Sequence, residues 1–415
     1  MRASLTWPRM FPETYKRVLG ARGVATPLAG VTIGRLAIAA QPLSTILLVK
    51  ASTGSFAAAG LVEACYSLAA AGSLPVQGRV IDRIGQTRVI VWVTLVNALA
   101  FAALIPLAAA DAPLAAMAFA GTIAGLATPP LGASMRSLWT RLVPHPELRQ
   151  AAFAIDAVAV DAAFILGPSL AAGVIAVASP SASLGMCVVL TLIGSAVFAA
   201  SAASRGWRGS PAHERGSSPL RSPGVLVLMG AALGVGIAVG ATEIAITAFA
   251  SEHGAAEVGG TLVALQAAGS VMGGLWFGAR RWRRSAGERL PAAALVFALC
   301  LLPLVAVPSI AAAFPLMAIS GLALAPTISV IYLLLGPLAP EGTDVEATGW
   351  VLMAIVSGAA LGNGTAGVAV TELSPHAGLA VGLAGGLVTV GVTWAGRHHL
   401  SVPVEGTPVR LLSSS

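Results

Sequence analysis

The sequence is most informative at Gly78-Arg79-Val80-Ile81-Asp82-Arg83-Ile84-Gly85-Gln86-Thr87-Arg88. This stretch separates two apolar runs, 55–77 and 89–110, each close to the roughly 20 helical residues that cross a hydrocarbon layer. Its glycines suit a backbone that must bend, its acid can cap a helix start, and its arginines suit contact with water. The stretch therefore predicts a tight turn between two membrane-spanning helices.

Working outward from this turn, we find further apolar runs of the same length along the whole chain. The apolar content is 56% and the charged content is 10%, against about 25% charged residues in soluble domains. This composition excludes a soluble enzyme and predicts an all-α integral membrane protein with twelve transmembrane helices. The expected spans are 27–50, 55–77, 89–110, 113–135, 151–177, 182–203, 224–249, 257–279, 290–309, 311–335, 348–372 and 377–396.

The basic residues test this count, because short loops rich in Lys and Arg stay in the cytoplasm. With twelve alternating spans, every one of the 24 Lys and Arg except Arg35 and Lys50 falls on the same side of the membrane. We therefore expect a multi-pass protein of the inner (plasma) membrane with a cytoplasmic segment 1–26 and a cytoplasmic tail 397–415. The net charge of +7 is then a mark of topology and predicts no nucleic-acid partner.

The longest break between spans is 204–223, which is rich in Ser, Pro, Gly and Arg and has no apolar periodicity. It predicts a cytoplasmic linker between two six-helix bundles, 27–203 and 224–396. Two pseudo-symmetric halves are typical of secondary transporters.

The stretch from Gly78 resembles the G-x-x-x-D-R-x-G-x-x-R signature of the major facilitator superfamily, and it stands at the expected place in a twelve-helix chain. The resemblance implies a transporter that works by alternating access, with gating residues Gly78, Asp82, Arg83 and Gly85. Asp82 could reach the start of the eleventh helix near Thr348, or Arg136 at the inner end of the fourth. The alternative is that the arginines only fix the topology. The second half, at 274–289, keeps a glycine and the basic run but lacks the acid, which suggests asymmetric gating.

Ionisable residues inside spans are costly and so mark candidate functional sites. Glu63 and Asp161 are our candidates for proton coupling, with Arg35 as a counter-ion or an anchor for an anionic group. The alternative is a static ion pair of Arg35 with one of these acids. The full set of cavity candidates is Arg35, Glu63, Asp156, Asp161 and Glu243, and the possible substrate-lining residues are Gln41, Tyr66, Gln266, Tyr332, Trp350 and Asn363.

The stretch Phe164-Ile165-Leu166-Gly167-Pro168 resembles part of the Gly-Pro motif that antiporters of the superfamily carry on their fifth helix, which favours export and assigns Gly167 and Pro168 to the gate. The fourth helix, however, lacks a basic residue in its outer half, so we expect Arg136 at its inner end to serve the gate.

We thus predict proton-coupled efflux of a small amphipathic or drug-like molecule by a monomer that uses the proton gradient and no bound cofactor or metal. A proton-coupled importer of a sugar, metabolite or other nutrient would have the same architecture. A non-transporting sensor would be expected to carry a soluble domain or a long tail. An intramembrane enzyme would need a catalytic cluster, and neither HExxH nor GxSxG is present.

Overall fold

The computed structural model describes residues 7–207, 218–255, 258–280, 282 and 284–400, and all regular structure in these ranges is helical. The prediction of twelve spans is confirmed, because twelve helical segments are long and apolar enough to cross a membrane. Parts of the predicted linker, 208–217, and tail, 401–415, lie outside the described residues, as do residues 1–6, Arg281 and Arg283.

The first half contains six spans after a short amphipathic helix. In chain order its helices are α1 (Trp7–Leu19), α2 (Ala25–Thr53), α3 (Phe56–Ile84), α4 (Gln86–Ala109), α5 (Leu114–Leu126), α6 (Leu131–Leu142), α7 (Pro146–Val177), α8 (Pro180–Ala200) and α9 (Ala202–Arg205). The second half has η1 (Pro219–Arg221), α10 (Pro223–Glu252), α11 (Gly259–Ala279), α12 (Ala286–Leu301), η3 (Leu302–Ala306), α13 (Ile310–Leu322), α14 (Leu324–Leu338), α15 (Asp344–Glu372), α16 (Pro375–Ala395) and η4 (Arg397–Leu400).

The two halves repeat the same packing scheme. In the first half α2 packs against α7 and α8, α3 against α5, and α4 against α8. Their counterparts six spans later do the same: α10 packs against α15 and α16, α11 against α13, and α12 against α16. This correspondence gives the pseudo-symmetry expected of a six-plus-six transporter fold.

The fourth span of each half is interrupted at a corresponding place. In the first half α5 stops before Thr128-Pro129-Pro130 and α6 continues the span. In the second half α13 ends at Leu322 and α14 begins at Leu324, two residues before Pro326. Proline has no backbone N–H and clashes with the preceding turn, so both interruptions follow from the local sequence.

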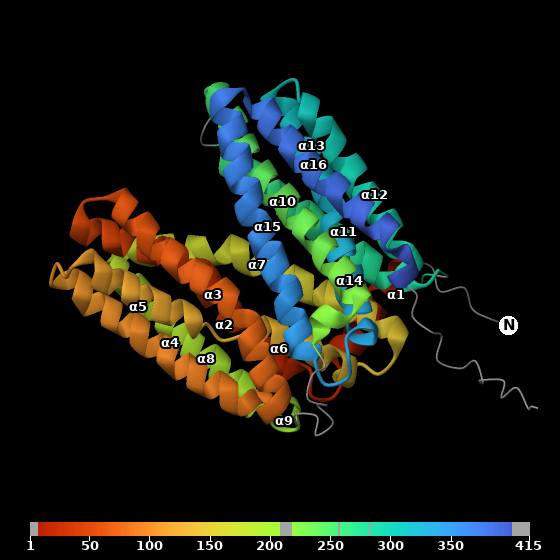
Figure 1. Cartoon of the computed structure of the whole chain (residues 1–415), viewed down its shortest axis with the longest axis horizontal. Coiled ribbons are helices and arrows are strands. Elements are labelled where there is room, and N and C mark those ends of the chain that lie inside the picture. Colours follow the sequence, from red (N-terminus) through yellow and green to blue (C-terminus); the bar gives the residue numbers. More distant parts are fainter. Residues whose placement is uncertain (1–6, 208–217, 256–257, 281, 283, 401–415) are drawn as a thin grey trace, which may run out of the picture.

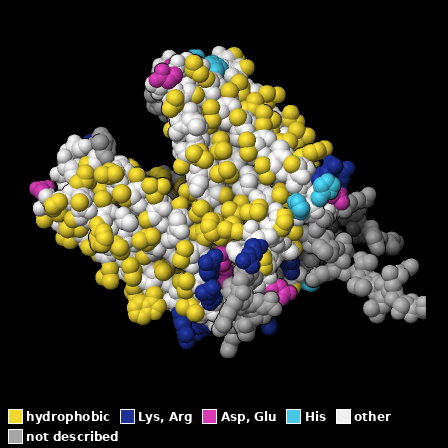
Figure 2. Space-filling model, in the orientation of Figure 1, with side chains coloured by type: hydrophobic (Ala, Val, Ile, Leu, Met, Phe, Trp, Pro, Cys, Tyr) yellow, Lys and Arg dark blue, Asp and Glu magenta, His cyan; other side chains and the backbone are white. Residues whose placement is uncertain are grey.

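The two bundles form a V in Figure 1, joined at one end and apart at the other. A hydrophobic core at the joined end contains residues of both halves, among them Trp139, Phe153, Tyr332 and Val345. Two further cores belong to one half each, around Met117 in the first and Phe249 in the second. Figure 2 shows the hollow between the lobes and the Lys and Arg side chains gathered where the lobes join. We call the joined end the arginine-rich end.

Small residues allow corresponding helices to approach closely. A Cβ at Gly167 of α7 would meet Ala39 and Ala40 of α2, and one at Gly358 of α15 would meet the backbone of Leu233 on α10. Glycine at both positions thus permits backbone contact between the fifth and first spans of each half. Pro168 follows inside α7, which continues through it to Val177.

Candidate functional site

Asp82 joins the two halves at the arginine-rich end. It lies in the last turn of α3, and its carboxylate accepts hydrogen bonds from the first-turn N–H groups of α15, at 3.2 Å from Val345 N and 2.8 Å from Glu346 N. These N–H groups have no partner within their own helix, and the helix dipole favours a negative charge there. Of the two partners predicted for Asp82, the structure places it at the start of the eleventh span and not beside Arg136.

Two glycines of the signature permit this contact. Gly78 faces the backbone of Val345 and Glu346, where an added Cβ would lie 2.7 Å from Val345 O and from Glu346 Cα. Gly85 ends α3 with φ of +96°, a conformation that favours glycine. Arg83 is exposed, and no hydrogen bond or ion pair of its side chain is found within the described ranges.

Replacing Gly78 with valine should therefore prevent closure at the arginine-rich end. The added side chain must displace the backbone of α15, at a cost of about 1–3 kcal/mol for overpacking of this kind. We expect a cysteine introduced at Val345, which is fully buried in the α3–α15 contact, to react with a maleimide at least about fivefold faster in this variant. Gly72→Val is the matched control, because a Cβ added at Gly72, on the same helix, would have no atom within 4 Å. Equal behaviour of the two variants would contradict the assignment of Gly78 to the gate.

Arg79 forms a second link between α3 and α15. Its Nη2 and Nε atoms donate to the two carboxylate oxygens of Glu346 at 2.6 and 3.1 Å. Trp350 Nε1 donates to the same carboxylate at 3.4 Å. The sequence does not mark Glu346 as a gate residue, since an acid in the first turn of a helix is also what the helix dipole alone would favour.

The corresponding junction in the second half uses different chemistry. Here Gln150 of α7 donates from Nε2 to Phe277 O near the end of α11, and its Oε1 accepts from Arg289 Nη1 of α12 at 2.6 Å. Tyr15 of α1 also donates to α11, at Leu275 O, and burial raises the pKa of its phenol, so it stays a donor at neutral pH. At the first junction an acid, Asp82, accepts from the N–H groups at the start of α15. At the second junction the neutral donors Tyr15 and Gln150 reach carbonyl groups at the end of α11. No charge pattern in the sequence marks Gln150.

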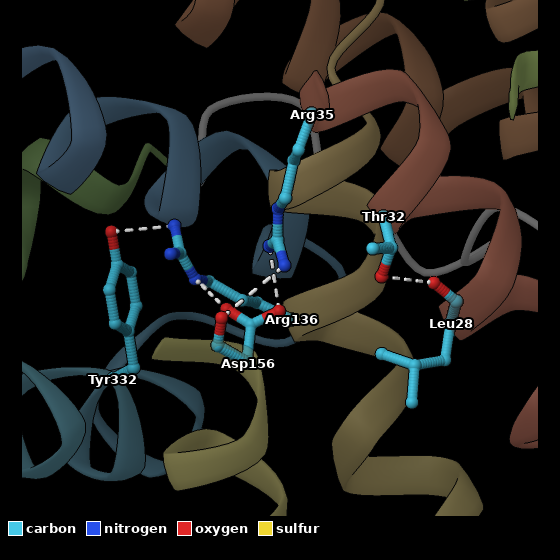
Figure 3. Close-up of polar contacts among 6 residues, drawn as sticks. All are labelled: Leu28, Thr32, Arg35, Arg136, Asp156 and Tyr332. Carbon is cyan, nitrogen blue, oxygen red and sulfur yellow. Dashed lines mark hydrogen bonds and ion pairs between the residues drawn. The ribbon is translucent and has the colours of Figure 1, made fainter. Parts of the chain in front are cut away.

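A buried charge cluster also lies between the halves at the arginine-rich end, and Figure 3 shows how its side chains converge. Asp156 of α7 accepts from Arg35 Nη2 of α2 at 2.7 Å and from Arg136 Nε of α6 at 2.8 Å. Arg136 Nη1 also donates to the hydroxyl of Tyr332 on α14 at 2.9 Å. The exposed fraction of these four residues is at most 9%. Three spans of the first half are thereby tied to one span of the second.

The cluster contains two cations and one anion, so Asp156 is needed to compensate both guanidinium groups. Arg35 pairs with Asp156 and with neither Glu63 nor Asp161, which the sequence offered as partners in the alternative of a static ion pair. The ring of Tyr332 lies 4.1 Å from Arg136 Cζ and adds a cation–π contact. Arg136 thus stands at the contact between the halves.

The other predicted cavity acids have different surroundings. Glu63 is half-buried and accepts from Gln41 Nε2 at 3.0 Å and Ser67 Oγ at 3.3 Å. Asp161 is half-buried against α11, with Ser270 as its neighbour and Oδ2 without a hydrogen-bond partner. Glu243 of α10 is exposed. Within the described ranges neither Glu63 nor Asp161 has a cationic partner, and no group of His, Cys, Asp or Glu could hold a metal ion.

The predicted substrate-lining residues fall into different environments. Those packed inside one half are Gln41, Tyr66 and Gln266, where Thr128 Oγ1 donates to the Tyr66 hydroxyl and Gln266 donates to Ser320. Tyr332 lies in the contact between the halves, and Trp350 donates to Glu346 within α15. Asn363 is exposed on α15. The structure therefore does not gather these six residues around a single site.

Comparisons with known proteins agree on the fold. A family model described as the Major Facilitator Superfamily matches residues 28–363. The structure is similar to the crystal structure of a bacterial homologue of the iron transporter ferroportin in an outward-facing state, with 16% identity, 90% of this chain and 99% of that chain covered, and a TM-score of 0.75. It is also similar to the human organic anion transporter MFSD10 (TETRAN), with 16% identity, 92% and 99% coverage, and a TM-score of 0.64. No curated protein sequence matches.

Proposed function

Because this chain belongs to the major facilitator superfamily, and is therefore a multi-pass membrane transporter and not an enzyme, we propose that it is a proton-coupled antiporter. In this proposal it exports a small amphipathic or drug-like molecule by alternating access. The observation that carries the proposal is the pair of half-buried carboxylates, Glu63 and Asp161, which have no cationic partner among the described residues.

The proposed cycle rests on where the two halves touch. The contacts of Asp82, Arg79, Gln150 and Arg136 all lie at the arginine-rich end, and the lobes stand apart at the other end (Figure 2). By the positive-inside rule we assign the arginine-rich end to the cytoplasm. The described conformation is then outward-facing. Breaking these contacts would open the arginine-rich end to the cytoplasm.

The proposed proton carriers are distinguished from Asp156 by their partners. A carboxylate that leaves water without a compensating cation is costly, so such a group binds and releases protons as its exposure changes. Glu63 and Asp161 fit this requirement, and Asp161 also touches α11 of the other half. Asp156 is held ionised between two arginines and has a structural role in this proposal.

The proposed substrate class follows from the scarcity of charged groups in the spans. Away from their ends, the spans of the described ranges contain only three acids without an ion pair, Glu63, Asp161 and Glu243, and Arg35 is paired with Asp156. A hollow between spans with so few charged groups favours a largely apolar molecule with few polar groups. The partial Gly-Pro motif at Gly167 and Pro168 supports export.

The test is transport into vesicles that contain the purified protein and carry an imposed pH gradient. We expect Glu63→Gln and Asp161→Asn each to reduce gradient-driven accumulation of a responsive compound about tenfold or more, because neither amide can carry a proton. The compounds are a panel of amphipathic dyes, drugs and sugars.

Glu372→Gln is the control, because Glu372 is an exposed acid at the end of α15 and should support normal transport. If both neutral variants accumulate the compound at the full rate, the proton assignment is wrong. If sugars move and amphipathic compounds do not, the substrate class is wrong.

A further inference from the structure

A lateral cleft opens on the second half, and at one end it reaches the contact between the halves, where Phe277 and Arg289 meet Gln150. It has a volume of about 900 Å³ and lies between α11 and α12, which pack against α13 and α14 more than against each other. Its walls are apolar and include Met272, Trp276 and Val296, whose side chains are 62%, 40% and 51% exposed. Exposed apolar side chains on membrane-spanning helices face lipid, so this cleft opens toward the hydrocarbon.

One end of the cleft is basic and aromatic. Arg280, Arg284 and Arg289 line it together with Trp282, and Glu288 is the acid beside them. Arg280 Cζ lies 5.2 Å from the ring centre of Trp276 and 5.1 Å from that of Trp282. Within the described ranges none of the three arginines forms an ion pair. The cleft thus has an excess of positive charge at the level where arginine and tryptophan mark the membrane interface.

The length of the cleft corresponds to a single leaflet. Its lining on α12 extends from Glu288 to Cys300, a distance of about 18 Å at 1.5 Å per helical residue. The hydrocarbon core of a bilayer is roughly 30 Å thick. An occupant with its polar group at Arg289 would therefore place an apolar chain along half of the membrane.

We propose that this cleft binds an anionic phospholipid from the leaflet at the arginine-rich end. The phosphate lies between Arg280 and Arg289, and an acyl chain lies along Met272, Val296 and Cys300. Basic pockets between membrane helices bind acidic lipid headgroups through such charge complementarity. The site is independent of the direction of transport and of the proton carriers.

The bound lipid has a consequence for the gate. Arg289 donates to Gln150 of the first half, a neutral partner that leaves the cationic charge uncompensated. A phosphate beside Arg289 supplies the missing anion and holds the guanidinium where it reaches Gln150. Anionic lipid therefore stabilises closure at the arginine-rich end. This also gives a role to the basic residues of the segment 274–289, which lacks a counterpart of Asp82.

The test is native mass spectrometry of the purified full-length chain titrated with phosphatidylglycerol, phosphatidylcholine or glycerol 3-phosphate. We expect saturable binding of phosphatidylglycerol, weakened about tenfold or more in Arg280→Gln/Arg289→Gln. Ala293→Phe should weaken it as well, because it fills the apolar part of the cleft without changing charge. Arg397→Gln is the control, since Arg397 also lies over a tryptophan, 5.3 Å from the ring centre of Trp394, but outside the cleft.

Three outcomes would overturn the proposal. Undiminished phosphatidylglycerol binding in the double variant would exclude the arginines, and equal binding of phosphatidylcholine would exclude recognition of the anionic headgroup. Glycerol 3-phosphate binding that competes with the lipid at equal affinity and is insensitive to Ala293→Phe would indicate a soluble phosphate site. None of these measurements depends on transport, so their failure leaves the proposed function untouched.

Discussion

Replacing Asp156 with asparagine should destabilise the protein by about 3–5 kcal/mol, the cost of removing one partner from a buried ion pair. The variant leaves Arg35 and Arg136 buried with no anion between them, where the structure shows contacts of 2.7 and 2.8 Å to the carboxylate. We expect a clear drop in the midpoint of thermal unfolding in detergent, followed by circular dichroism, and loss of monodisperse protein after mild heating.

A second substitution separates charge compensation from simple loss of a hydrogen bond. Combining Asp156→Asn with Arg35→Gln removes one of the two uncompensated cations and should restore part of the lost stability, a non-additivity that a double-mutant cycle measures. Asp161→Asn is the matched control, since Asp161 lies five residues further along α7 without a cationic partner among the described residues. Equal destabilisation by the two single variants would contradict the assignment of Asp156 as the counter-ion.

The twelve spans could be predicted because they depend on a local pattern, whereas the resemblance of the loop gave Asp82 two alternative partners, of which the start of the eleventh span is one. Span length follows from runs of apolar residues, and the glycines and acid of the loop stand at fixed spacing in the chain. Gly78 and Asp82 are four residues apart, so a helix presents them on one face. That face meets α15 in the structure.

The partners of Arg35 could not be predicted, because they depend on how helices are rotated against one another. Asp156, Asp161 and Glu63 all lie at depths that a side chain on α2 could reach, and spacing along each helix does not decide among them. In the structure α2 and α7 approach closely at Gly167, and in this packing Arg35 meets Asp156. The role of Gln150 could not be predicted for a related reason, since a neutral side chain carries no signal in a charge pattern.

Replacing Asp82 with alanine should shift the protein away from the conformation closed at the arginine-rich end. The carboxylate makes two hydrogen bonds to the first turn of α15, and a hydrogen bond to a charged group contributes about 1.5–3 kcal/mol. These bonds exist only while the halves touch at the arginine-rich end. Their loss therefore destabilises the conformation closed at this end and leaves the conformation open at this end unchanged. A difference of about 2 kcal/mol alters the ratio of the two states roughly 30-fold.

The measurement is the rate at which a cysteine at Val345 reacts with a maleimide, in a background lacking Cys65, Cys187 and Cys300. Val345 is fully buried in the contact, so the rate follows the population open at this end. We expect Asp82→Ala to raise the rate about 30-fold and to slow transport, because a cycle that favours one conformation passes through the other less often. Arg88→Gln, an exposed change in the first turn of α4, should leave the rate unchanged. An unchanged rate in Asp82→Ala would contradict this role of Asp82. It would mean that the ion pair of Arg79 with Glu346 holds the halves together without the hydrogen bonds of Asp82.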